Sequence, residues 1–139
     1  MERASSSSLV KTSTTGQRRI LVVDDEALVC QTVMILLKHD GHLVTAVSSG
    51  EEALAVFEPG KFDLVITDFA MPSMNGRQVA EAIKSRAPGQ AVGLFTAHAE
   101  RLRGDTETLG LVDFLIEKPV DIDSLREAVS KFPRPNSEN

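Results

Sequence analysis

The sequence contains no tryptophan or tyrosine, and Cys30 is its single cysteine. Its six phenylalanines are the only aromatic residues, so the stacking platforms on which proteins bind nucleic-acid bases are missing. One thiol cannot form an internal disulfide. Cys30 shares a helical spacing with Val33, Met34 and Leu37, which predicts a thiol in the core rather than a reactive one.

Long apolar runs are also missing. No stretch approaches the roughly 20 residues that span a bilayer, and the amino terminus has no signal-peptide hydrophobic region. The formal net charge is −5, without a basic run, which disfavours direct nucleic-acid binding. We therefore expect a cytoplasmic protein that contacts neither nucleic acid nor membrane. Its 139 residues suit one domain with one core.

Five apolar runs alternate with helical patterns and predict strands, at residues 19–23, 43–47, 64–68, 91–95 and 112–116. Helices are expected after each strand, and the fourth, over about 99–108, is weak because Gly104, Thr106 and Thr108 disfavour it. This alternation predicts βαβ units and a parallel sheet covered on both faces.

The two ends of the chain have little to bury. Residues 1–17 are rich in serine and threonine and are expected to be a disordered tail, and residues 133–139 a short polar tail. With no output domain after Phe132, a start at Met1 and a Ser/Thr leader, we expect a free-standing chain.

Polar residues follow the predicted strands where each strand ends. Asp24 and Asp25 follow the first strand, Asp68 ends the third, Thr96 follows the fourth and Lys118 the fifth. Carboxyl ends of parallel strands meet at one edge of a sheet, so these side chains are expected to converge there. Three crowded carboxylates need a cation, and Mg²⁺ suits oxygen ligands that leave room for a phosphate.

Four segments in order resemble the signatures of response-regulator receiver domains of two-component signalling: Leu21–Glu26, Thr67–Gly76, Phe95–Ala97 and Lys118-Pro119. The resemblance covers about residues 18–132. It implies a flavodoxin-like, doubly wound (βα)5 fold of the α/β class, with five parallel strands in the order 2-1-3-4-5. A stand-alone receiver would act by docking to another protein or by passing the phosphoryl group onward.

The resemblance also implies roles. Asp68 is the phospho-acceptor and takes a phosphoryl group from a phosphohistidine of a sensor histidine kinase or histidine phosphotransfer protein. Asp25, Asp68 and the backbone carbonyl of Ala70 hold Mg²⁺, and Asp24 acts mainly through a bound water. Such a domain catalyses its own phosphorylation and dephosphorylation but is not a turnover enzyme.

The resemblance further implies that Lys118 pairs with one phosphoryl oxygen and that the Thr96 hydroxyl donates a hydrogen bond to another. It also implies a cis Lys118-Pro119 bond. The family's switching aromatic lies three residues before the lysine, where this chain has Leu115, with Phe114 one position earlier. Either the switch is muted or Phe114 takes that role. Output is expected through the fourth helix, fifth strand and fifth helix. In the family, two further positions tune how long the phosphoryl group lasts. This chain has Ala70 and His98 there, and they leave that lifetime open.

Simpler interpretations exist for each site residue. Asp24 or Asp25 alone would be a helix cap, Thr96 an ordinary strand-end hydroxyl and Lys118 a solvated lysine. The combination with Asp68 favours a site, as does the position of Lys118 before Pro119 on an expected inner strand.

Other functions fit less well. A haloacid dehalogenase-type phosphatase needs a general acid where this chain has Ala70, and Asp24-Asp25 would repel the phosphate of FMN. A receiver fragment of a hybrid kinase, or a scaffold of the same fold that binds partners unphosphorylated, stay open as alternatives.

Overall fold

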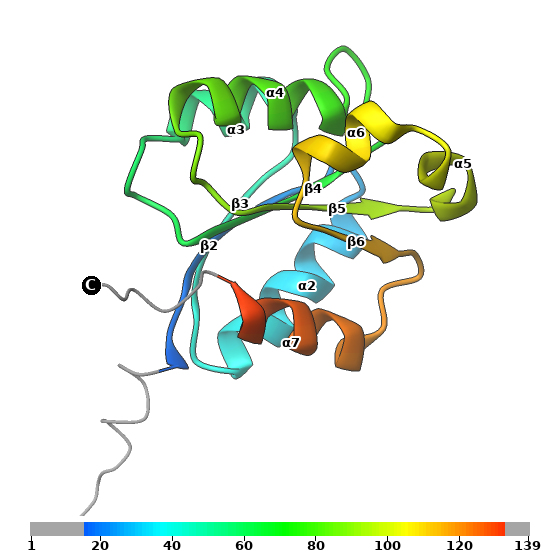
Figure 1. Cartoon of the computed structure of the whole chain (residues 1–139). Coiled ribbons are helices and arrows are strands. Elements are labelled where there is room, and N and C mark those ends of the chain that lie inside the picture. The colour runs from blue at the N-terminus through cyan, green and yellow to red at the C-terminus, as the bar shows by residue number, and fades with distance from the viewer. Residues whose placement is uncertain (1–15, 133–139) are drawn as a thin grey trace, which may run out of the picture.

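The computed structural model describes residues 16–132, so nearly all of the predicted tails, 1–17 and 133–139, lies outside the described residues. A five-stranded parallel sheet forms the centre, in the order β3-β2-β4-β5-β6 (Figure 1). This confirms the predicted order 2-1-3-4-5. The strands are β2 (Arg19–Val23), β3 (Leu43–Val47), β4 (Leu64–Asp68), β5 (Val92–Thr96) and β6 (Phe114–Glu117).

Helices cover both faces of the sheet, as predicted. They are α2 (Ala27–His39), α3 (Gly50–Val56), α4 (Gly76–Arg86), α5 (Ala99–Arg103), α6 (Thr106–Leu111) and α7 (Ile122–Lys131). In Figure 1, α2 and α7 lie on one face, and α3, α4 and α6 on the other. Alternate residues of β2 and β4 feed the two core clusters: Ile20 and Ile66 pack with α2 and α7, whereas Leu21 and Val65 pack with α3 and α4.

Local signals in the sequence account for several helix ends. Gly41 follows α2 with a φ of 96°, a left-handed conformation that glycine adopts without strain. Asn75 caps α4 in a complete capping box with Gln78. Ser49 caps α3 by accepting from the Glu52 amide, but the Glu52 carboxylate accepts from Ser48 instead of completing the box. Cys30 lies in the core beside Val33, as predicted.

The predicted single helix over 99–108 is wrong, because the segment forms α5 and α6 with a break between them. Gly104 ends α5, and the carboxylate of Asp105 accepts hydrogen bonds from the amide and hydroxyl of Thr108 at 3.1 and 2.7 Å. An aspartate at this spacing starts a new helix instead of extending the old one. Thr108 is thereby buried without an unpaired hydroxyl.

Two predicted strands are displaced toward the carboxyl terminus. β5 spans Val92–Thr96 instead of 91–95, and β6 spans Phe114–Glu117 instead of 112–116. Val112 caps the end of α6, and Asp113 exchanges hydrogen bonds with the backbone of Val92 at 2.7 and 2.8 Å, so the strand begins only afterwards. β6 is also an edge strand, so the expected inner-strand position of Lys118 is wrong.

Among residues 16–132, no helix is both long and apolar enough to cross a bilayer.

Candidate functional site

Three aspartates meet at the carboxyl edge of the sheet. Asp68 is the last residue of β4, and Asp24 follows β2 directly; both are buried, whereas Asp25 is exposed. One carboxylate oxygen from each lies within 4.8 Å of the others. The parallel pairing of β2 with β4, Val23 opposite Thr67, brings these strand ends together.

The oxygens of Asp24 have unequal environments. Oδ1 accepts a hydrogen bond from the amide of Glu26 at 2.9 Å, which shapes the turn into α2. Oδ2 is buried and accepts no hydrogen bond within the described part of the chain. Three carboxylates whose oxygens lie this close together, two of them buried, offer the oxygen ligands that a hard divalent cation prefers. The residues present therefore fit Mg²⁺.

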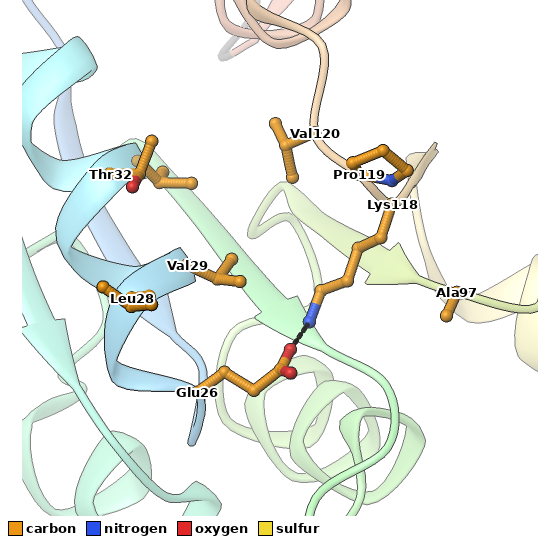
Figure 2. A pocket seen from close by; sticks show the side chains of 9 residues that line it. Glu26, Leu28, Val29, Thr32, Ala97, Lys118, Pro119 and Val120 are labelled. Carbon is orange, nitrogen blue, oxygen red and sulfur yellow. Dashed lines mark hydrogen bonds and ion pairs between the residues drawn. The ribbon is translucent and has the colours of Figure 1, made fainter.

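Lys118 supplies the positive charge of this pocket. Its Nζ lies 3.0 Å from Asp68 Oδ1 and 3.1 Å from Asp24 Oδ2, and it donates a 2.6 Å hydrogen bond to Glu26 Oε1 (Figure 2). The Lys118 amide donates to the carbonyl of Thr96 at 2.7 Å, and the Lys118-Pro119 bond is cis, as predicted.

Burial and charge shift the acidities of these groups. Burial, together with the neighbouring Asp24 and Asp25, raises the pKa of Asp68 to about 6, against the opposing effect of Lys118. Burial also raises the pKa of Asp24, against the Glu26 amide and Lys118. For Lys118, burial disfavours the ammonium, but Glu26, Asp68 and Asp24 outweigh that cost and raise its pKa. Lys118 is therefore a fixed cation, and Asp68 takes up a proton at a higher pH than an ordinary aspartate does.

Thr96 and Ala70 lie around the same edge. Thr96 is the buried last residue of β5, and its Oγ1 accepts a hydrogen bond from the amide of His98 at 2.9 Å. Ala70 is exposed, two residues past Asp68. That loop returns tightly to α4, since a Cβ at Gly76 would lie 2.5 Å from the carbonyl oxygen of Asp68.

Leu115 and Phe114 point to opposite faces of β6. Phe114 stacks on Phe132 with ring centroids 5.4 Å apart, and its ring fills the space that a Cβ at Gly93 would take. It belongs to the core between the sheet and α7. Leu115 pairs in register with Leu94, whose side chain reaches toward α4. Leu115 thus stands at the position of the family's switching aromatic and points toward the side of the sheet where α4 lies. Phe114 has the aromatic ring but packs on the opposite side, against Phe132.

Comparison with known proteins agrees with this geometry, since the family profile described as response regulator receiver domain matches residues 20–130. The chain belongs to the response regulator receiver domain family. As a family, receiver domains are phospho-acceptors.

Among individual relatives, the receiver resembles the alginate biosynthesis transcriptional regulatory protein AlgB of Pseudomonas aeruginosa, at 35% identity over 88% of this chain. It spans 27% of that protein's length, and 48% and 26% of two further curated relatives.

Among solved structures, it resembles the response regulator TrrA from Thermotoga maritima in complex with Mg²⁺ and BeF. Their identity is 35%, the TM-score is 0.76, and the match covers 82% of this chain and 97% of that one. TrrA in complex with the histidine kinase ThkA matches with a TM-score of 0.74, at the same identity and coverage.

Glu26 is the residue of this site that the sequence left without a role. It stands in the acidic segment after the first strand, but its partner is 92 positions away. No spacing rule connects residues so distant, so the sequence held no signal for the contact.

Proposed function

We propose that this receiver takes a phosphoryl group on Asp68 from a phosphohistidine, on a sensor histidine kinase or histidine phosphotransfer protein, in the cytoplasm. One observation supports this most: Asp68 is buried at a strand end, 3.0 Å from a lysine and beside two more aspartates. The kinase complex of the similar regulator TrrA supports the kind of partner.

Each residue has a defined part in the transfer. An oxygen of Asp68 attacks phosphorus as the phosphorus–nitrogen bond to the histidine breaks, so no proton needs to leave Asp68 when it is ionised. Lys118 and the Thr96 hydroxyl donate hydrogen bonds to phosphoryl oxygens. Asp24, Asp25, Asp68 and the carbonyl of Ala70 would hold Mg²⁺, which gathers negative charge from the transferring group when bound.

Phosphorylation adds nearly two negative charges at the sheet edge. The Thr96 hydroxyl that would donate to them also accepts a hydrogen bond from the His98 amide, which couples the site to the start of α5. We propose that output runs through α5, α6, β6 and α7, with Leu115 moving little and Phe114 staying packed on Phe132. The domain catalyses its own phosphorylation and dephosphorylation without being a turnover enzyme.

Intact mass spectrometry tests the proposal directly. The protein is incubated with Mg²⁺ and acetyl phosphate, alongside Asp68→Asn and an EDTA control. We expect the mass of one phosphoryl group to be gained by the wild type, and to be lost with the substitution or with chelation. If the protein gains no mass and also binds no Mg²⁺ in a titration, the unphosphorylated scaffold replaces this proposal.

A further inference from the structure

Glu26 joins two loops at the mouth of the acidic pocket. It is the N-cap residue of α2, a position where short polar side chains usually bond to the helix, but its carboxylate makes no cap hydrogen bond. Its amide is fixed by Asp24 Oδ1, and its Oε1 accepts the 2.6 Å hydrogen bond from Lys118. The side chain therefore reaches from the β2–α2 loop across to the β6–α7 loop (Figure 2).

The three carboxylates around Lys118 differ in exposure. The side chains of Asp24 and Asp68 are 0% and 6% exposed, whereas that of Glu26 is 60% exposed. Among the three carboxylates, that of Glu26 lies nearest to Nζ, at 2.6 Å, and the two aspartates form ion pairs with it at 3.0 and 3.1 Å. The shortest of these three contacts of Lys118 Nζ is therefore with the carboxylate that is most exposed to water.

This arrangement sets up a competition. A phosphoryl group on Asp68 brings oxygens that need donors, and Lys118 has three N–H groups to share among them and the carboxylates. The Glu26 carboxylate gives up this bond at little cost, since water can solvate it. The buried aspartates have no such alternative.

We propose that Glu26 is a positioning residue that holds Lys118 at the mouth of the pocket and competes with the phosphoryl group for its N–H donors. Glu26 thereby restrains phosphorylation of Asp68. This inference rests on the proposed function. With acetyl phosphate, the Asp68 oxygen forms its bond to phosphorus as the bond to the acetate oxygen breaks, and acetate leaves. Lys118 stays protonated and changes only its acceptor.

The test measures the phosphorylation rate of the whole chain against acetyl phosphate concentration at saturating Mg²⁺, for wild type and Glu26→Gln. Freeing Lys118 stabilises the bound phosphoryl group before and during transfer. We expect the half-saturating donor concentration to fall about threefold, the scale of a partly exposed ion pair, with a maximal rate within about twofold of wild type.

Glu117→Gln is the matched control, because it removes one exposed carboxylate beside Lys118 in the chain, at the end of β6. We expect it to behave as wild type. An equal fall in both variants would show general repulsion of the anionic donor and would overturn the inference, as would an unchanged Glu26→Gln.

A Mg²⁺ titration tests whether Glu26 acts as a metal ligand instead of as a partner of Lys118. The inference expects Glu26→Gln to bind Mg²⁺ within about twofold of wild type, and a loss of tenfold or more would make Glu26 a metal ligand instead. Thermal unfolding checks that each variant is folded. Failure of the wild type to gain a phosphoryl group would count against the proposed function itself. A phosphorylated wild type with an unaltered Glu26→Gln would count against the role of Glu26 alone.

Discussion

At the residue scale, the acidic pocket contains buried aspartates whose ionised forms are unfavourable when no metal ion is bound beside them. Asp24 and Asp68 are buried side by side, and Lys118, shared with Glu26, is the cation within reach of both. Burial raises the pKa of both aspartates even with the lysine present. The ionised form of Asp68 therefore lowers the free energy of unfolding. A cation bound beside this carboxylate, or its phosphorylation, alters that cost.

Asp68→Asn is expected to stabilise the metal-free protein at pH 7 by about 1–3 kcal/mol. The native pKa of Asp68, about 6, lies above the ordinary 3.8. The folded wild type therefore binds more protons than the unfolded chain between these values, and its free energy of unfolding falls as pH rises from about 4 to about 6. Asparagine is neutral at every pH, so the free energy of unfolding of Asp68→Asn does not fall from this cause. Urea unfolding in EDTA at pH 4.5 and pH 7 measures it, and an equal difference at both pH values would contradict the assignment.

Lys118→Met is expected to destabilise the protein by about 2–3 kcal/mol at pH 7.5, because Asp24 and Asp68 stay buried without their cation. The loss should shrink at pH 5, below the pKa of about 6 of Asp68, because that carboxyl then takes up a proton. Lys84→Met is the matched control: Lys84 pairs with Asp113 at 3.1 Å, but both side chains are more exposed. Its loss should stay under about 1 kcal/mol. Equal losses in urea unfolding for the two variants would contradict the buried-charge account.

At the element scale, one aromatic contact links β5, β6 and the end of α7. Gly93 of β5 faces the Phe114 ring, which stacks on Phe132 just after α7. The neighbouring segment is weaker, since α5 and α6 are short and separated at Gly104. The proposed output face therefore combines a packed element, α7, with two short helices suited to local rearrangement.

Gly93→Ala is expected to lower the free energy of unfolding by about 1–3 kcal/mol, because the added methyl group would overlap the Phe114 ring. Urea unfolding measures the change. Gly89→Ala is the control: no atom lies within 4 Å of its added Cβ, and it should change stability by less than about 0.5 kcal/mol. The double variant Gly93→Ala/Phe114→Leu should recover part of the loss. No recovery would place the clash elsewhere.

At the scale of the whole molecule, one edge of the sheet carries the chemistry and the flank beside β6 carries the proposed output. Thr96 ends β5 and Lys118 directly follows β6, the two strands nearest this flank, and the Lys118 amide donates a hydrogen bond to the Thr96 carbonyl. A change at Asp68 therefore reaches β5 and β6 through the backbone as well as through side chains. The opposite flank, β3 and α3, has no such link through Thr96 or Lys118 within the described residues.

Hydrogen exchange tests this asymmetry. With Mg²⁺ and beryllofluoride as the phosphoryl mimic, exchange should change in residues 97–111 and 114–131 and stay nearly constant in α3. Deuterium uptake by mass spectrometry, with and without the mimic, provides the comparison, and Asp68→Asn is the control. A change confined to the loops that contact the mimic would contradict output through α5, α6, β6 and α7.

The residues of the acidic pocket could be predicted from local patterns in the amino-acid chain. Apolar runs ending in Asp24 and Asp68, and Lys118 before Pro119, identify strand ends, and the alternation of strands and helices makes the sheet parallel. A parallel sheet has all these ends at one edge, so topology alone brings the residues together. The break before Asp105 also had a local signal, the aspartate three residues before Thr108, which outweighed the helical pattern.

The contacts of Glu26 and Phe114, in contrast, depend on packing between segments that are far apart in the chain. The Glu26 carboxylate had a helix cap, water and Lys118 as alternatives, and the choice depended on the distance between two loops that no local pattern encodes. The face that Phe114 occupies depended on where β6 begins, and the hydrogen bonds between Asp113 and Val92 set that start. A shift of one residue in a strand reverses every side chain, so long-range packing determines what alternation leaves open.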